Sequence, residues 1–282
     1  MKHVVIGAGP SGVVAVETLR KLQPEAEITL VGEEKEAPYS RMALPYFLIN
    51  QIAEEGTHLR KGADHFAGQR IAVRQDKVVG IDRAGRKVSL AGGETLAYDK
   101  LLIATGSHPV APPIPGMDLP GIFSCWTLAD GRNIAARAKP GAKVILMGAG
   151  FIGCIILEAL AQSGADLTVV EMEDRMVPRM MNDTAGNLIK SWCVSRGVRV
   201  HTSTRVTGIA KGDGHLLQAT LSTGEVLQAD LIVSATGVKP NVAFLAGSGI
   251  EVDQGILINR HMQTNDPNIF AAGDVAQGRD FS

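Results

Sequence analysis

The chain has 282 residues, 45% of them hydrophobic, and a formal net charge of −1, which leaves enough apolar material for two buried cores. It contains no run of five Lys or Arg residues, which argues against nucleic acid and against an anionic membrane surface as partners. Its three cysteines are far apart and form no C-x-x-C, which argues against a disulfide framework and against a metal site. The amino terminus enters an apolar strand directly and does not resemble a secretory signal, so we expect a cytoplasmic protein with reduced thiols.

Residues 2–34 have the pattern of a nucleotide-binding unit. An apolar run at 2–6 predicts a strand, and G-A-G-P-S-G at 7–12 predicts a tight turn followed by an amphipathic helix. A second apolar run at 28–31 predicts the next strand, and Glu33 follows its end.

The same order recurs at 143–171. An apolar run at 143–147 precedes G-A-G-F-I-G at 148–153, a predicted helix, and a strand at 167–170 that ends at Glu171. Such a long internal repeat indicates two related units rather than a solenoid.

Each copy continues into further strands and then closes on Ala-Thr-Gly, at 104–106 and at 235–237. The expected strands lie at 78–82, 87–90 and 98–104 in the first copy, and at 198–202, 216–221 and 230–235 in the second. Four matches in the same order twice favour common architecture over chance.

Two proline-containing segments, 107–116 and 238–241, mark crossings between the units. Strands are expected again at 255–258 and 268–274. The simplest arrangement is an α/β protein with two nested Rossmann-like domains. Residues 1–110 and 240–282 form the first domain, and residues 111–239 are inserted as the second.

The glycines of each turn have distinct physical roles. The first permits the tight turn, the second lets the backbone approach a pyrophosphate, and the third lets helix and strand pack closely. The helix amino terminus then presents N–H groups to the phosphates. These residues are Gly7, Gly9 and Gly12 in the first turn and Gly148, Gly150 and Gly153 in the second.

An acid after the second strand can accept hydrogen bonds from ribose hydroxyls, and Glu33 and Glu171 occupy that position. Each could instead be a solvated charge at a strand end. A carboxylate at Glu171 would repel a 2′-phosphate, which favours NADH over NADPH. Arg175 is the counter-argument, because a nearby arginine can accept that phosphate.

With Y-S-R-M-A-L-P-Y at 39–46 and F-A-A-G-D-V at 270–275, the chain resembles the FAD-dependent pyridine nucleotide–disulfide oxidoreductase superfamily. Within it, the chain is similar to the branch that holds NADH oxidases, nitrite reductase large subunits, and rubredoxin or ferredoxin reductases. The resemblance implies the glutathione reductase-like fold, with FAD on the first domain and NAD(P)H on the second.

The resemblance also implies roles for single residues. Asp274 would hold the ribityl chain of FAD, Arg41 would lie near its diphosphate, and Val78 would meet the adenine through its backbone. Thr105 and Gly106 would lie beside FAD. The other cofactor-binding candidates are Pro10, Ser11, Glu34, Ile152, Gly237 and Gly273.

Alternatives remain for two of these residues. Asp274 could cap a helix that begins at Val275, and Arg41 could be a solvated or core-pairing arginine. Relatives continue through that helix into a C-terminal domain, so we expect a truncated chain that lacks this domain. A homodimer is expected only where the domain is present.

Two departures from the relatives narrow the function. Met42 occupies the position of a redox cysteine, so a thiolate relay is excluded there, and the three cysteines are expected to be packed thiols. Tyr46 and Ile155 replace a Lys/Glu pair beside the flavin, which predicts a less polar pocket, and Glu158 lies one turn beyond. We name no catalytic side chain and no metal ligand.

The preferred hypothesis is an enzyme, an FAD-dependent NAD(P)H dehydrogenase or reductase without a redox-active cysteine. Hydride would pass from NADH to flavin N5, and electrons would then reach an unidentified small-molecule or redox-protein acceptor. One alternative is a component similar to a nitrite reductase large subunit. The other is an FAD- and NAD-binding sensor or interaction module with negligible turnover.

Overall fold

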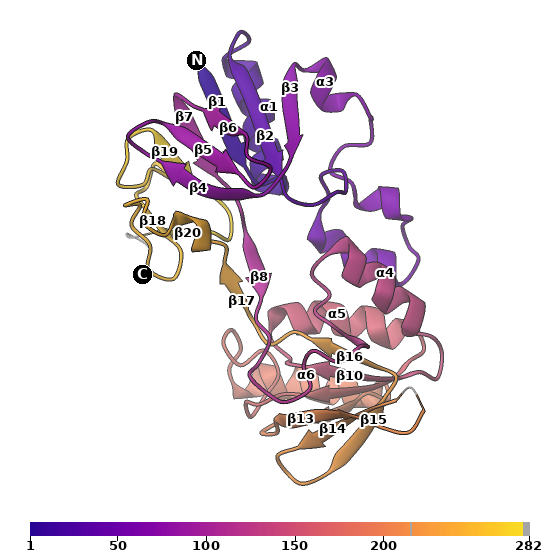
Figure 1. Ribbon diagram of the computed structural model, residues 1–282. Helices are drawn as coiled ribbons and strands as arrows, with labels where there is room; N and C mark the ends of the chain where they lie inside the picture. Colours follow the sequence, from indigo (N-terminus) through magenta and orange to yellow (C-terminus); the bar gives the residue numbers. More distant parts are fainter. Residues whose placement is uncertain (215, 279–282) are drawn as a thin grey trace. The chain divides into compact units, whose positions relative to one another are not determined.

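The structure is a computed structural model that describes residues 1–214 and 216–278 (Figure 1). It divides into two compact units. The first comprises residues 1–40, 58–108 and those from 239 onward, and the second comprises residues 41–57 and 109–238. Each unit is built on a five-stranded parallel sheet, which confirms the predicted α/β class with two nested Rossmann-like units. None of the helices in these described ranges has the length and apolarity needed to cross a bilayer.

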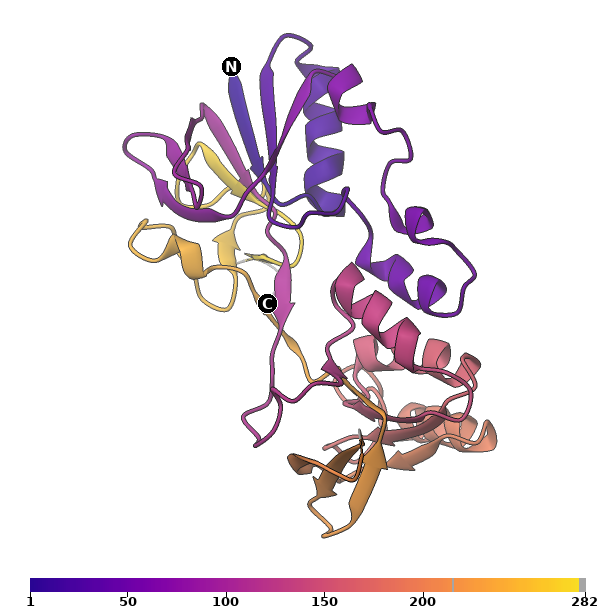
Figure 2. The same ribbon diagram turned by 45° about the vertical axis from the view of Figure 1, so that its right-hand side comes forward.

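The sheet of the first unit has the strand order β19-β7-β1-β2-β3. Residues of β1 alternate between its faces: Val5 packs with Val13 of helix α1, whereas Val4 and Ile6 pack toward an antiparallel sheet, β4-β5-β6. Both views show α1 lying along the parallel strands (Figures 1 and 2). The elements are β1 Lys2–Ile6, α1 Pro10–Leu22, β2 Glu27–Gly32, β3 Ile71–Gln75, β4 Val78–Asp82, β5 Lys87–Leu90, β6 Thr95–Ala97, β7 Lys100–Ile103 and β19 Ile269–Ala271.

The second unit repeats this plan with the strand order β12-β11-β10-β16-β9. Val144 and Leu146 of β10 pack toward the helices, and Ile145 and Met147 pack toward a second antiparallel sheet, β13-β14-β15. The elements are β9 Ile122–Phe123, α4 Leu128–Arg137, β10 Lys143–Met147, α5 Phe151–Gln162, β11 Asp166–Val170, α6 Asp183–Ser195, β12 Arg199–His201, β13 Val206–Lys211, β14 Leu217–Leu221, β15 Val226–Ala229 and β16 Leu231–Ser234.

The segment 41–57 belongs to the second unit, although the sequence places it inside the continuous stretch 1–110. Its helix α2 (Leu44–Leu48) contacts α4 and α5, because the buried side chains of Leu44 and Leu48 need an apolar partner. The other short elements are η1 Arg41–Ala43, η2 Glu54–Thr57, α3 His65–Gly68, β8 Ser107–Pro109, β17 Val238–Pro240, η3 Ala243–Leu245, β18 Ile256–Ile258 and β20 Ala276–Gly278.

The sequence analysis allowed for a helix that begins at Val275 and is capped by Asp274. No such helix forms in the described residues, so this interpretation is wrong. Val275 is a buried turn residue, and β20 follows it and pairs in parallel with β18. The backbone N–H of Ile256 donates to the Val275 carbonyl at 2.8 Å, so pairing with β18 supplies the backbone bonds that a helix would otherwise provide. The chain beyond Gly278, on which the expected continuation of the helix depends, lies outside the described residues.

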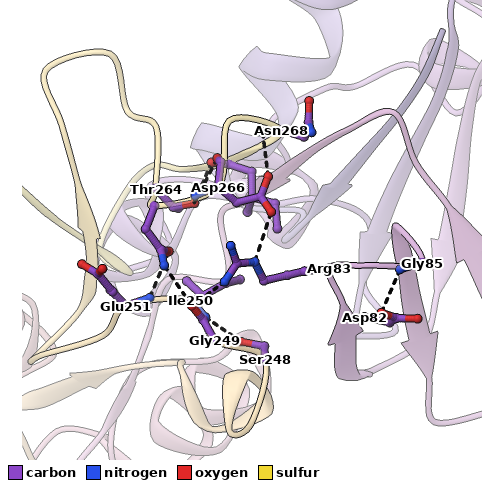
Figure 3. A network of polar contacts seen from close by, with 12 residues as sticks. Asp82, Arg83, Gly85, Ser248, Gly249, Ile250, Glu251, Thr264, Asp266 and Asn268 are labelled. Atoms are coloured by element: carbon purple, nitrogen blue, oxygen red, sulfur yellow. Dashed lines mark hydrogen bonds and ion pairs between the residues drawn. The ribbon is translucent and has the colours of Figure 1, made fainter.

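Arg83, in the loop between β4 and β5, ties the returning chain to the first unit (Figure 3). Its Nε donates to Asp266 Oδ2 at 3.1 Å, and its Nη1 donates to the Gly249 carbonyl at 2.5 Å. Asn265 Nδ2 also donates to that carbonyl, at 2.9 Å. These contacts of Arg83 hold two loops of the final forty residues against the antiparallel sheet. The strand β19, which follows Asp266, pairs with β7 and completes the parallel sheet.

Candidate functional sites: two nucleotide-binding turns and an apolar pocket

The first glycine of each turn has a backbone that an L-residue rarely adopts. Gly7 has φ +112° and Gly148 has φ +91°. A Cβ at Gly7 would collide with the backbone oxygen of Ala104, and one at Gly148 would lie 2.6 Å from that of Ala235. Both alanines begin an Ala-Thr-Gly tripeptide, so the repeated tripeptide packs directly under the repeated turn.

The second and third glycines differ from each other in the same way in both units. A Cβ at Gly12 would collide with the Gly7 carbonyl, and one at Gly153 would collide with the Gly148 carbonyl. By contrast, apart from the two adjacent residues, no atom of the described chain lies within 4 Å of a Cβ built at Gly9 or Gly150. The third glycine is therefore required by the protein's own packing. The middle glycine faces open space, in which a ligand's diphosphate can come close to the protein backbone.

Helices α1 and α5 start at these middle glycines. Neither Gly9 nor Gly150 provides a side-chain cap, and neither helix has an acidic residue in its first turn. Helix α1 has 13 residues and α5 has 12. The uncapped amino terminus of a helix of this length presents N–H groups and a partial positive charge to an anion. The geometry at both turns thus fits a diphosphate.

The two strand-end acids lie in different surroundings. Glu33 is 63% exposed and forms an ion pair with Lys77 at 2.9 Å. Glu171 is only 6% exposed, so it is not a solvated strand-end charge. Its Oε2 accepts from the backbone N–H of Ala149 at 2.6 Å, and its Oε1 accepts from that of Glu173 at 2.8 Å. The carboxylate of Glu171 is therefore bound to the second turn itself.

A third group of expected residues lies beside the first turn, in the first unit. Gly273 has φ +78°, and a Cβ there would lie 2.8 Å from Ser11 Oγ. Asp274 is exposed, and its Oδ2 accepts from Ser107 Oγ at 3.1 Å. The structure therefore brings together the first turn and the glycine–aspartate turn, which are more than 260 residues apart in sequence.

Asn241, which the sequence reasoning did not select, organises the segment after the first Ala-Thr-Gly. Its Nδ2 donates to the Thr105 carbonyl at 2.8 Å, and Thr105 Oγ1 donates to the Asn241 carbonyl at 3.0 Å. The backbone N–H of Asn241 donates to the carbonyl of Gly106, whose φ is +64°. Its only sequence signal was its place in the Val-Lys-Pro-Asn return crossing.

The remaining candidates have ordinary structural contacts. Val78 is buried at the start of β4, and Glu34 accepts from the Tyr39 hydroxyl at 2.6 Å. Gly237 has φ +128°. Pro10 is the first residue of α1, and Ile152 packs against the core of the second unit.

Arg41 belongs to the second unit rather than to the group at the first turn. Its Nη1 donates to the Trp126 carbonyl at 2.5 Å, and its guanidinium lies 5.3 Å from the centre of the Trp126 ring. This arginine therefore helps to hold η1 against the loop that precedes α4.

A pocket of about 310 Å³ lies within the second unit, where the segment 41–57 meets α5. Met42, which is 60% exposed, and Tyr46, which is 53% exposed, line it together with Ile155 of α5. The positions expected from the sequence to differ from the relatives thus line one mainly apolar pocket. Its lining residues are Met42, Pro45, Tyr46, Ile49, Gln51, Ile155, Glu158, Ala159 and Gln162.

The three cysteines have the properties of packed thiols. Burial raises the pKa of Cys125 to about 12 and that of Cys154 to about 11, and it also raises the pKa of Cys193. All three therefore remain protonated near neutral pH, where a nucleophilic thiolate relay would need an ionised sulfur.

A chain with two such turns, each closed by Ala-Thr-Gly, is a two-dinucleotide protein of the Rossmann type. Residues 1–280 match the family described as pyridine nucleotide-disulphide oxidoreductase. The chain belongs to this family, which confirms the resemblance found in the sequence. FAD and NAD(P)H are the cofactors of the family, and the open glycine turns fit their diphosphates.

Individual relatives agree with this assignment. The chain is 33% identical over 277 residues to rhodocoxin reductase of Rhodococcus erythropolis, covering 98% of this chain and 65% of that protein. It is 31% identical over 283 residues to rubredoxin-NAD(+) reductase of Pseudomonas putida, covering 100% and 73%. The crystal structure of a covalent putidaredoxin reductase–putidaredoxin complex matches with a TM-score of 0.94 and 28% identity, covering 99% of this chain and 69% of that chain.

Proposed function

We propose that the chain is an FAD-dependent reductase that oxidises NADH and passes the electrons to an external redox protein. The observation that carries the proposal is the pair of open middle glycines, Gly9 and Gly150, each at the uncapped start of a helix. A bound diphosphate needs both open space and the free N–H groups of a helix start, and each of these turns offers the two together.

The first unit would hold FAD, because it offers more than a diphosphate cradle. Asp274 lies beside the first turn with a carboxylate that can accept from sugar hydroxyls, and Thr105 and Gly106 are held close by Asn241. A long ligand with a polyol chain would use both places. The proposed FAD-binding residues, all in the first unit, are Gly7, Gly9, Pro10, Ser11, Gly12, Glu33, Glu34, Val78, Thr105, Gly106, Gly273 and Asp274.

The second unit would hold the nicotinamide dinucleotide. The proposed residues are Gly148, Gly150, Ile152, Gly153, Glu171 and Gly237. When bound, FAD supplies the chemistry of accepting hydride from nicotinamide and releasing electrons to an acceptor. The protein contributes binding and orientation at the two turns.

NADH is the proposed coenzyme because Arg175 is occupied by the protein's own groups. Its Nη1 lies 2.7 Å from Asp174 Oδ1 and 3.1 Å from Asp183 Oδ1, and its Nε donates to the Met181 carbonyl at 3.0 Å. A 2′-phosphate at the end of β11 would meet the carboxylate of Glu171. Electrostatic repulsion there would disfavour NADPH.

The proposed acceptor is a small iron-containing redox protein, since relatives are named as reductases of rhodocoxin and rubredoxin. The chain spans 65% of the rhodocoxin reductase, so acceptor and whole-protein activity are both part of the proposal. A second candidate is direct oxidation by oxygen, which is favoured by a 30% identical relative named NADH oxidase, from Methanocaldococcus jannaschii.

Anaerobic rapid mixing of the FAD-loaded chain with NADH tests the proposal. We expect rapid bleaching of the flavin absorbance, with NADPH slower by about tenfold or more, equivalent to about 1.4 kcal/mol. Absence of bleaching with intact FAD binding would instead support a nucleotide-binding sensor or interaction module. Reoxidation by air or by added rubredoxin then separates the two acceptors.

A further inference from the structure

The segment from Glu171 to Met181, here called the strap, is bound to the second glycine turn at one residue. The carboxylate of Glu171 accepts from the backbone N–H of Ala149, and the backbone N–H of Val177 donates to the Ala149 carbonyl at 2.8 Å. Ala149 is completely buried. Both backbone groups of the residue between Gly148 and Gly150 are therefore held by the strap.

Val177, whose N–H bonds to Ala149, has a strained backbone conformation. Its φ is +49°, a left-handed conformation that is strained for an L-residue and rare for a β-branched side chain. Its carbonyl accepts from the N–H groups of Met180 and Met181, and the preceding Met176 is fully buried. Such strain persists where surrounding contacts over-determine the conformation, and it concentrates at ligand-binding segments.

Arg175 closes the strap on itself. Besides its ion pair with Asp174 and its bond to the Met181 carbonyl, its Nη2 donates to the Pro178 carbonyl at 3.3 Å. A further ion pair, to Asp183, connects it to the first turn of α6. The rigid fork of a guanidinium suits this set of partners, and an ammonium has only one nitrogen with which to serve them.

We propose that the strap is a preformed support for the second glycine turn, and that Arg175 is a positioning residue for nicotinamide dinucleotides rather than a ligand of a 2′-phosphate. The inference rests on the proposed function, because it assigns the dinucleotide to this turn. Arg175 orders the strap, the strap fixes Ala149, and Ala149 fixes the direction in which the amides after Gly150 point. Arg175 therefore influences NADH and NADPH alike.

Arg175→Met, compared with the unaltered chain, is the central test. The FAD-loaded proteins are titrated with NAD⁺ and with NADP⁺ by calorimetry. Both affinities should fall by the same factor, about tenfold if the strap is ordered for only a tenth of the time, and their ratio should stay constant. Arg175→Lys should recover only part of the loss. Arg199→Met is the matched control, since Arg199 pairs with Asp166 on the same sheet without contacting the strap, and it should change neither affinity.

Hydrogen exchange of the ligand-free proteins provides a readout that does not depend on binding. Arg175→Met should accelerate exchange at 148–153 and 171–181 and leave 7–12 unchanged. Loss of NADP⁺ affinity alone would show a phosphate ligand and overturn the proposal, as would unchanged exchange with unchanged affinities. If the unaltered chain binds neither nucleotide, the proposed function fails, and the exchange result still decides whether Arg175 holds the turn. Circular dichroism identifies a variant that has simply unfolded, in which case Arg175→Lys is read by the same criteria.

Discussion

Gly150→Ala should weaken binding of the nicotinamide dinucleotide while leaving the fold intact. The φ of Gly150 is −69°, which alanine adopts without strain, and a Cβ there would have no neighbour within 4 Å in the described chain apart from the adjacent residues. The protein itself should lose only the preference of a helix cap for glycine over alanine, about 0.5–1 kcal/mol. The new methyl group would occupy the space proposed for the diphosphate, where overpacking typically costs about 1–3 kcal/mol. We therefore expect affinity to fall by about 10- to 200-fold.

The assay combines calorimetric titration with NAD⁺ and thermal unfolding, and Gly9→Ala is the matched variant in the other unit. Gly9→Ala should weaken FAD and spare NAD⁺, whereas Gly150→Ala should do the opposite. Gly153→Ala should behave differently from both, because its methyl group would collide with the Gly148 carbonyl and destabilise the unit without any ligand. If Gly150→Ala folds normally and binds NAD⁺ like the unaltered chain, the open space does not receive the diphosphate and the reasoning is refuted.

Other measurements probe the surrounding structure. The hydroxyl of Tyr98 is buried with no hydrogen-bond partner in the described part of the chain, so Tyr98→Phe should raise the free energy of unfolding by about 1 kcal/mol. Burial raises the pKa of Tyr98 to about 12 from 10.0, so the unfolded state ionises first and stability should fall as pH rises through this interval. Denaturant titrations should show that Tyr98→Phe lacks this fall; an identical fall would disprove the assignment. In the pocket, Ile155→Glu should lower the free energy of unfolding, and adding Tyr46→Lys should restore about 1 kcal/mol of it, because the two new charges attract each other. A double-mutant cycle measures this coupling. Additive effects would mean that the two positions do not face each other. Arg83→Met should lower unfolding stability by about 2 kcal/mol by leaving Asp266 without this cation, with NAD⁺ affinity unchanged; a change in affinity would contradict a role confined to the first unit.

The repeated strand–turn–helix pattern was readable from sequence because its determinants are local. The strands at 78–82, 87–90 and 143–147 have the predicted bounds, since apolar runs are closed there by turn residues. The tight turn at the first glycine and the close packing at the third were likewise predictable, and the backbone angles and Cβ contacts agree with both. The strand–turn–helix pattern depends on residues within about thirty positions of one another. The contacts of Gly7 with Ala104 and of Gly148 with Ala235 are the exception, because they join residues far apart in the sequence.

Features that depend on distant partners could not be read in the same way. Leu44 and Leu48 are apolar, but no local pattern shows which core receives them, and that core lies in the second unit. An acid at position 171 was visible, yet its bonds to Ala149 and Glu173 require the folded strap. Val275 precedes a strand because β18 is available as a partner, which no local window contains.

The discontinuity of both units has a consequence for biosynthesis. All segments of the second unit have been translated by residue 238, whereas β19 and β20, which complete sheets of the first, appear more than thirty residues later. During synthesis, therefore, the second unit can fold before the first. Until β19 has been made, β7 remains an unpaired edge of the first unit's sheet. An exposed edge of this kind promotes aggregation. Slow translation or early termination near residue 260 should therefore lower solubility, although most of the chain has been made by then.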